Sequence, residues 1–187
     1  MDEIVKQAMR KWPNVPACTG WLGLDARGHW FMRDAATQAR GPFAQAKGAQ
    51  LQHEALAQFI GRNYGCDAQG QWFFQNGPQR VFVELEAAPW VLRVTDAKGD
   101  DDGIVTHTGR VARFQQSLVD EQGRVYLLTD LGLGLVHSQD MLAFSNRMEC
   151  DARWQPSEVC SHELEARFGF VLSPAQRQAQ QIQHTRE

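Results

Sequence analysis

The stretch Asp67-Ala68-Gln69-Gly70-Gln71-Trp72-Phe73 decides the fold, because it nearly repeats the earlier stretch Asp25-Ala26-Arg27-Gly28-His29-Trp30-Phe31. A looser copy is Asp120-Glu121-Gln122-Gly123-Arg124-Val125-Tyr126, and Asp96-Ala97-Lys98-Gly99 repeats the turn alone. An aspartate side chain accepts hydrogen bonds from the backbone that follows it, and a glycine adopts a positive φ at the end of such a turn. Aromatic and β-branched residues then favour a strand. The motif predicts equivalent turns at Gly28 and Gly70, each leading into a strand.

The residues around the second copy predict a helix followed by strands. One helical face carries Leu56 and Phe59, so residues 50–63 are expected to form an amphipathic helix. Asn76-Gly77 is a hairpin signal between strands expected at residues 71–75 and 79–86. Pro89 ends the second of these strands, and residues 90–94 begin another.

The rest of the chain repeats this alternation less clearly. Strands are expected at residues 104–107, 111–119 and 125–129, whereas residues 131–136 are expected to be apolar and flexible. Residues 138–148 fit a helix or a strand, and Ser157 is expected to cap a helix that runs to Phe168 and stops at Gly169. The sequence therefore predicts an α+β fold of two related halves, built of antiparallel hairpins with one or two packed helices each. The expected boundaries are 1–95 for the N-terminal half, 104–172 for the C-terminal half and 173–187 for a flexible tail.

Composition excludes several classes of protein. The chain has 187 residues with six Trp and ten Phe, which makes a disordered chain implausible. Its 19 Lys and Arg against 22 Asp and Glu give a net charge of −3, so no nucleic-acid partner is expected. No apolar run is long enough to span a membrane, and the acidic start lacks the layout of a signal peptide. A cytoplasmic protein with four reduced thiols is expected, at Cys18, Cys66, Cys150 and Cys160.

The layout resembles an uncharacterised family of conserved proteobacterial proteins of unknown function. The residues that carry the resemblance are Gly28-His29-Trp30-Phe31, the helix with Leu56 and Phe59, Gly70-Gln71-Trp72-Phe73-Phe74, and the run from Pro78 to Trp90. The likeness covers residues 20–150 and is strongest from 50 to 95. A related group of such proteins has an α+β fold built of repeated motifs, for which a signalling role has been suggested. The resemblance therefore implies a repeated α+β fold, and it brings no catalytic residues.

Sequence motifs for known chemistry are absent or incomplete. Gly132-Leu133-Gly134 lacks the third glycine and the basic residue of nucleotide-binding loops, so it is expected to form a flexible turn. Three soft ligands, Cys150, Cys160 and His162, could bind a metal with His107 or His137, but their spacing is poor for zinc. The run Asp100-Asp101-Asp102 lacks the distal glutamate of a calcium loop and is expected to be a solvated loop. No metal and no cofactor are therefore predicted.

Two functions remain open at this point. The first is a non-enzymatic binding or regulatory module for an unidentified protein or small molecule, of undetermined oligomeric state. Its predicted site residues are Trp72, Phe74, Arg80 and Phe82. Because side chains alternate along a strand, Arg80 and Phe82 are expected to be partly accessible on one face of the sheet. The opposite face, which carries Val81, Val83 and Leu85, is expected to pack on the helix with Leu56. The alternative is a small hydrolase or metal-dependent enzyme with a site between the halves. Its candidate residues are His107, His137, Asp140 and Cys160, with Asp130 as another acid for the histidines.

Overall fold

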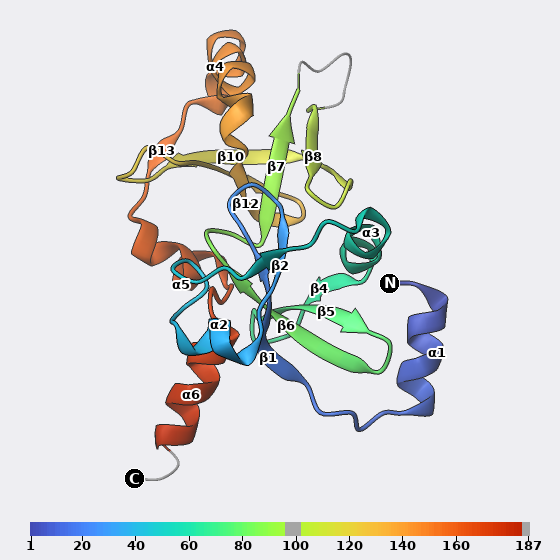
Figure 1. Ribbon diagram of the computed structural model, residues 1–187. Helices are drawn as coiled ribbons and strands as arrows, with labels where there is room; N and C mark the ends of the chain where they lie inside the picture. Colours follow the sequence, from blue (N-terminus) through green and yellow to red (C-terminus); the bar gives the residue numbers. More distant parts are fainter. Residues whose placement is uncertain (96–101, 185–187) are drawn as a thin grey trace. The chain divides into compact units, whose positions relative to one another are not determined.

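The computed structural model describes residues 1–95 and 102–184, which form two β-sheets with associated helices (Figure 1). The chain folds as two compact units. Unit 1 contains Met1–Asp25, His29–Glu86 and the segment that begins at Phe170. Unit 2 contains Ala26–Gly28 and Ala87–Gly169. The predicted α+β fold with two parts is confirmed, since each unit has its own sheet.

The sheet of unit 1 has six strands in the order β3-β2-β1-β6-β5-β4. Their bounds are β1 Cys18–Leu24, β2 Trp30–Met32, β3 Ala49–Gln50, β4 Tyr64–Cys66, β5 Trp72–Asn76 and β6 Gln79–Leu85. The central pair, β1 and β6, is parallel, and the other pairs are antiparallel. The sequence pattern predicted strands β2, β5 and β6 but not β1, β3 or β4. It did not predict the parallel pairing either, because the pattern of a strand does not show which neighbour it will have.

Helices cover both faces of this sheet. They are α1 Glu3–Lys11, α2 Ala35–Ala39, α3 Glu54–Arg62 and α6 Pro174–His184. On one face, the ring of Phe59 in α3 meets the ring of Phe74 with their centroids 5.6 Å apart. On the other face, Glu84 of β6 accepts hydrogen bonds from Ser173 Oγ at 2.5 Å and from the Ala175 backbone N–H at 3.1 Å, at the start of α6. The segment that was expected to be a flexible tail therefore begins as a helix that contacts β1 and β6 (Figure 1).

The sheet of unit 2 has seven strands in the order β13-β10-β11-β12-β7-β8-β9. Their bounds are β7 Trp90–Val94, β8 Ile104–Thr106, β9 Val111–Ala112, β10 Phe114–Val119, β11 Val125–Thr129, β12 Gly132–Val136 and β13 Ser157–Glu158. The helices are α4 Met141–Cys150 and α5 Leu164–Phe168, with single 3-10 turns η1 Ser138–Asp140, η2 Ala152–Trp154 and η3 Ser161–Glu163. Within residues 1–95 and 102–184, no helix has the length and apolar character needed to cross a bilayer.

The repeated motif forms the same turn in both units. In each copy the aspartate N–H donates to the carbonyl of the residue four positions later, at 3.0 Å, and the aspartate Oδ1 accepts that residue's N–H at 2.8–2.9 Å. These aspartates are Asp25, Asp67 and Asp120. Gly28 and Gly70 have φ values of 83° and 78°, and strands β2 and β5 start at the tryptophans that follow, so the predicted equivalence is confirmed. The copy at 96–99 lies outside the described residues.

A further copy of this turn, at Thr106, has no aspartate. Thr106 donates its N–H to the Arg110 carbonyl at 2.8 Å, and its Oγ1 accepts the Arg110 N–H at 3.1 Å. Gly109 has a φ of 82°, like the glycines of the other copies. The threonine hydroxyl thus replaces the carboxylate as the acceptor, and the turn joins β8 to β9.

The structure corrects the expectation of a flexible turn at residues 131–136. Residues 132–136 form strand β12, which lies between β11 and β7 and is largely buried. A Cβ atom on Gly134 would lie 2.5 Å from Cγ of Leu92, so the glycine permits a close approach between strands and does not mark a turn.

The structure also decides two expectations for unit 2, the helix cap at Ser157 and the element at residues 138–148. Ser157 lies in β13 and caps no helix, although Gly169 does end α5 with a left-handed φ of 66°. Residues 138–148, left open between helix and strand, form η1 and most of α4.

Candidate functional site

The four predicted site residues lie on opposite faces of the unit 1 sheet. In the β5–β6 hairpin, Phe73 pairs with Phe82, and Phe74 pairs with Val81. Trp72 and Phe74 are buried on the α3 face, where the Trp72 ring lies 4.9 Å from that of Tyr64. Arg80 and Phe82 lie on the other face, with Phe73. The structure therefore brings these residues together only as two pairs.

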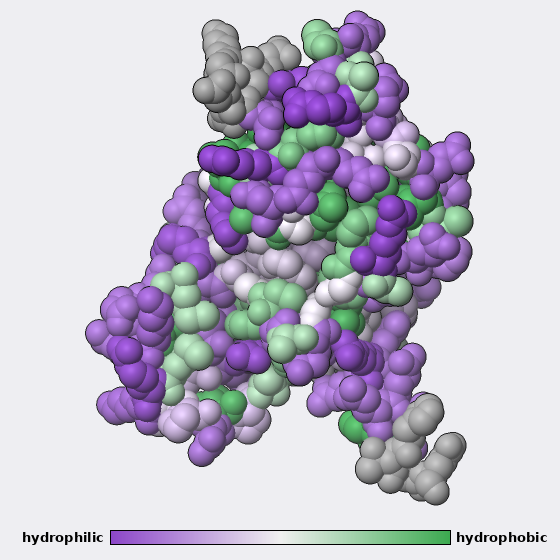
Figure 2. Space-filling view, turned by 180° about the vertical axis from the view of Figure 1, so that it is seen from behind, coloured by the Kyte–Doolittle hydropathy of each residue, from purple (hydrophilic) through white to green (hydrophobic). Residues whose placement is uncertain are grey.

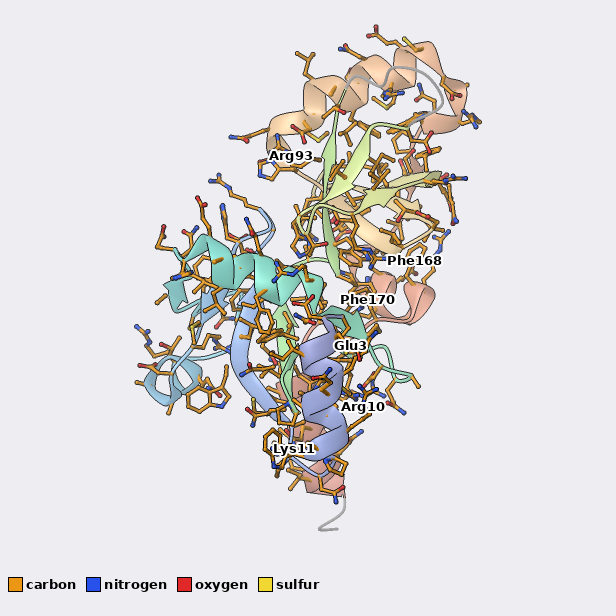
Figure 3. The ribbon with its side chains drawn as sticks, turned by 90° about the vertical axis from the view of Figure 1, so that its right-hand side faces the viewer. Glu3, Arg10, Lys11, Arg93, Phe168 and Phe170 are labelled. Carbon is orange, nitrogen blue, oxygen red and sulfur yellow. The ribbon has the colours of Figure 1, made fainter. Side chains whose placement is uncertain are left out.

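The pair Arg80 and Phe82 lies beside helix α1 and the segment that follows it. Both side chains are half-buried, which agrees with the predicted partial accessibility, and the guanidinium of Arg80 lies 4.2 Å above the Phe73 ring. They line a cavity of about 380 Å³ together with Met9, Trp12, Pro13, Val15, Ala17, Gln75 and Pro78. In Figure 3, α1 carries the labelled Glu3 and Arg10, whose side chains form an ion pair of 3.0 Å. This surface is therefore already occupied in large part by the chain's own N-terminal segment.

A larger apolar hollow, which we name the β1–α3 groove, opens on the opposite face. Its volume is about 530 Å³. It is lined by Cys18, Trp21, Leu22, Met32, Leu56, Ile60, Phe74, Asn76, Gln79 and Val81. Trp21, Met32 and Leu56 remain 48%, 55% and 37% exposed at its rim. Figure 2 shows hydrophobic residues among hydrophilic ones on the face that it draws, which is normal for a protein surface. The β1–α3 groove differs from such a surface because its large apolar side chains gather around one hollow.

The local sequence explains why the groove is apolar and incompletely covered. Leu22 pairs with Met32 on β2 and with Val83 on β6, so these side chains point to the α3 face. Helix α3 brings Leu56 and Ile60 to the groove but has only nine residues, and part of the sheet beside it stays open. A register shift between Cys18 and Leu22 leaves the Trp21 side chain at the rim.

The polar groups of the β1–α3 groove are few and uncharged at neutral pH. Asn76 and Gln79 supply amides, and Cys18 supplies a half-buried thiol. Burial raises the pKa of the Cys18 thiol above its ordinary value, so the thiolate needed for nucleophilic attack is disfavoured. The groove is therefore suited to holding an apolar group and not to covalent catalysis through Cys18.

A second hollow, which we name the loop pocket, adjoins the groove. It has a volume of about 960 Å³ and is lined by Trp21, Met32, Arg33, Asp34, Thr37, Arg40 and residues 44–49. Trp21 and Met32 line both hollows. The buried Arg33 organises the loop pocket, because its guanidinium donates to the carbonyls of Ala46 at 3.0 Å and Gly41 at 2.6 Å.

The candidate residues of the alternative enzyme reading have structural partners in unit 2. His107 Nδ1 accepts the Val91 N–H at 3.3 Å, and His137 Nδ1 accepts the Gln139 N–H at 3.2 Å. The Asp140 carboxylate binds Arg93, labelled in Figure 3, through two hydrogen bonds of 2.6 and 2.8 Å. Hydrogen bonds from Arg93 lower the pKa of Asp140 despite partial burial, so this acid stays ionised. The Asp130 Oδ1 accepts the Arg113 N–H at 2.7 Å.

The proposed metal ligands are not assembled into a site. Cys160 and Cys150 are exposed, and all four cysteines are free thiols. In the part of the chain that the structure describes, no three His, Cys, Asp or Glu side chains are placed to hold a metal ion. Asp100 and Asp101 lie outside the described residues, whereas Asp102 accepts the Phe114 N–H at 2.8 Å.

Two of the three rim residues, Trp21 and Met32, were not predicted as site residues. They lie in the first strand pair, whose sequence contains no cluster of charged or polar side chains. One signal was present: residues 21–24 include apolar side chains at consecutive positions, so β1 carries apolar groups on both of its faces.

Comparisons with known proteins assign a family but no activity. A search of the curated proteins finds no match. A DUF1285 family protein from Silicibacter pomeroyi DSS-3 has 15% identity and a TM-score of 0.46, over 80% of this chain and 84% of that chain. One from Shewanella baltica OS155 has 17% identity and a TM-score of 0.48, over 67% of this chain and 91% of that chain. The family model DUF2944, described as "Protein of unknown function (DUF2946)", matches residues 1–175. Since that match spans most of the sequence, the chain belongs to the DUF2944 family of unknown function.

Proposed function

We propose that this protein is a non-enzymatic binding module that holds an apolar small molecule in the β1–α3 groove. The observation that carries the proposal is the gathering of Trp21, Met32 and Leu56, all exposed by more than a third, around one hollow. A regulatory role would follow if the bound molecule changes how the protein meets a partner.

The size and lining of the β1–α3 groove support this proposal. Ligand pockets have volumes of roughly 300–1,000 Å³, mostly apolar walls and a small number of polar groups. The groove, of about 530 Å³, has an apolar floor at Phe74 and Val81 and two amides at its edge, from Asn76 and Gln79. Covering its exposed rim would remove apolar surface from water, which is favourable by roughly 25 cal/mol per Å².

The four residues predicted from the sequence have different roles in this proposal. Phe74 becomes part of the groove wall, and Trp72 supports that face from a buried position. Arg80 and Phe82 are assigned to the contact with α1 and the segment after it. The net charge of −3 favours a partner other than nucleic acid, and four free thiols suit the cytoplasm as the proposed compartment.

A fluorescence titration with the neutral apolar dye N-phenyl-1-naphthylamine tests the proposal. We expect saturable binding of one dye molecule per chain. Met32→Glu and Leu56→Glu should each weaken binding by about tenfold or more, because a carboxylate at the rim must lose its water when the dye binds. Both side chains are exposed, so thermal melting should show that the variants stay folded.

The matched control is Leu142→Glu, because Leu142 is 75% exposed on α4 in unit 2 and lies outside the groove. This variant should bind the dye like the wild type. The proposal fails if the wild type does not bind the dye, if Leu142→Glu weakens binding as much as the groove variants do, or if both groove variants bind normally.

A further inference from the structure

We infer that a second site of unit 1 binds a free aromatic carboxylate through the guanidinium of Arg80. The site, which we name the Arg80 cavity, is the hollow of about 380 Å³ that Arg80 and Phe82 line together with α1 and the segment after it. It shares no lining residue with the β1–α3 groove and lies on the opposite face of the sheet, so it would serve a different class of ligand.

The guanidinium of Arg80 has hydrogen-bond donors to offer a ligand. Its central carbon lies 4.2 Å from the centre of the Phe73 ring. In the part of the chain that the structure describes, this side chain forms no hydrogen bond and no ion pair. The five N–H donors of a guanidinium lie in its own plane, so a ring against its face leaves them available. Two such donors match the two oxygens of a carboxylate.

The positive charge of Arg80 meets no carboxylate within the cavity. Of the described residues that line it, Arg80 is the charged one and none is an acid. Glu84 lies on the same face of β6, but its carboxylate accepts hydrogen bonds from the start of α6 and interacts with the charge of Arg33. A ligand with one negative charge would therefore complement the cavity.

Helix α1 adds positive charge beside the cavity. The helix carries one acid and three bases. Its acid, Glu3, pairs with Arg10 at 3.0 Å, and Asp2 before the helix pairs with Arg62 at 3.3 Å (Figure 3). The ammonium of Lys11 lies 4.5 Å from the centre of the indole ring of the next residue, which is part of the cavity lining. The surroundings therefore favour an anion as well.

Partial burial increases the value of this charge for binding. An ion pair between fully exposed groups contributes little, because water screens both charges. Arg80 and Phe82 are half-buried, so a carboxylate that reaches the guanidinium meets it in a less polar environment than open water. Arg80 can therefore contribute to affinity as well as to orientation.

The other walls of the Arg80 cavity favour an aromatic ring. Trp12 is 51% exposed, and it lines the cavity together with Phe82 and Met9. Aromatic side chains and the methionine sulfur both make favourable contacts with a further ring. The volume lies at the lower end of the range for ligand pockets, which is suited to an acid with one or two rings.

The test compares 2-naphthoate with 2-naphthylmethanol, which share their rings and differ in charge at pH 7. Protein labelled with ¹³C at the methionine methyl groups is titrated with each compound. The Met9 signal reports on the Arg80 cavity, whereas Met32 reports on the β1–α3 groove. We expect 2-naphthoate to shift Met9 saturably, with about tenfold higher affinity than the alcohol, because a hydrogen bond between charged groups is the stronger one. Added salt should weaken this binding of 2-naphthoate but not that of the alcohol.

Variants assign the difference to Arg80. Arg80→Gln should reduce the affinity for 2-naphthoate to the level of the alcohol. The matched control is Arg113→Gln, which removes the same charge from an exposed position in unit 2 and should bind 2-naphthoate like the wild type. Trp12→Ala should weaken the binding of both compounds at Met9, and the exposure of Trp12 means that thermal melting should show a folded variant.

The wild type alone can overturn the inference. It fails if 2-naphthoate does not shift Met9, or if both compounds bind there equally well. It also fails if Arg113→Gln weakens binding as much as Arg80→Gln does. A short peptide with a C-terminal phenylalanine provides a third arm: a Met9 shift with this peptide but not with 2-naphthoate would assign Arg80 to a peptide end and overturn a free acid. None of these results affects the proposed function, which the neutral dye and Met32 test separately.

Discussion

Replacing Asp120 by alanine should destabilise the protein much more than the same change at Asp67, although both residues make the same turn. The two carboxylates differ in burial. The Asp120 side chain is fully buried, and its Oδ2 accepts hydrogen bonds from Arg124 Nε at 2.7 Å and from the Tyr126 hydroxyl at 3.1 Å. The Asp67 carboxylate is half-buried, and its Oδ2 accepts only the Gln71 amide, at 3.1 Å.

The magnitudes follow from the groups that each substitution leaves without a partner. At both positions, two backbone N–H donors lose their acceptor, the aspartate Oδ1, and each lost hydrogen bond costs about 1 kcal/mol net. Donors that are exposed can bind water instead, which offsets part of this cost. Asp120→Ala also leaves the hydroxyl of the buried Tyr126 unsatisfied, which costs about 1–3 kcal/mol. We therefore expect a loss of about 3–5 kcal/mol for Asp120→Ala and about 1–2 kcal/mol for Asp67→Ala.

Urea unfolding followed by circular dichroism measures both losses, and equal m-values show that the comparison is valid. Acidification provides a second readout. Burial raises the pKa of Asp120, but hydrogen bonds from Arg124 and Gln122 lower it overall below its ordinary value of 3.8. Its stabilising effect is therefore present above pH 3.8 and is lost as the pH falls through the lower pKa of the folded state. The difference between wild type and Asp120→Ala should shrink over that range.

Equal losses for the two variants, or a larger loss for Asp67→Ala, would refute the reasoning from burial. A difference between wild type and Asp120→Ala that stays constant on acidification would refute the assigned role of the ionised carboxylate.

Two other substitutions test the packing around β12 and β6. Gly134→Ala should lower the free energy of unfolding by about 1–3 kcal/mol, because its Cβ would lie 2.5 Å from the side chain of the buried Leu92; unchanged urea unfolding would contradict this. Burial raises the pKa of Glu84 above 4.5 despite hydrogen bonds from Ser173 and Ala175. The wild type should therefore lose stability as the pH rises through that raised pKa, and Glu84→Gln should lack this loss; parallel melting profiles of the two proteins from pH 4.5 to neutrality would contradict it.

Local chemistry in the sequence predicted the repeated turns and most strands. The turn at Asp67 depends on contacts within five residues, so its motif is sufficient to find it. The copy at Thr106 was not predicted, because a hydroxyl replaces the carboxylate, although Gly109 occupies the matching position. The parallel pairings of β1 with β6 and of β7 with β12 depend on contacts between distant segments, which no local pattern shows.

The candidate site was harder to predict for the same reason. The aromatic run at residues 72–74 indicated a binding surface, but alternation along β5 divides its members between two faces. Whether a face is open depends on what covers it. Helix α1 lies beside Arg80 and Phe82, whereas α3 leaves the sheet beside Met32 uncovered, and both facts come from tertiary structure alone.

The chain's five methionines allow the most direct test of the proposed groove. Protein labelled with ¹³C at the methionine methyl groups is titrated with N-phenyl-1-naphthylamine and followed by NMR. Met32 reports on the β1–α3 groove, Met9 on the cavity with Arg80 and Phe82, and Met141 and Met148 on α4 of unit 2. The account predicts a saturable shift of the Met32 signal while the other signals stay in place. A shift of Met9 with Met32 unchanged would contradict it and would place the ligand beside Arg80 and Phe82.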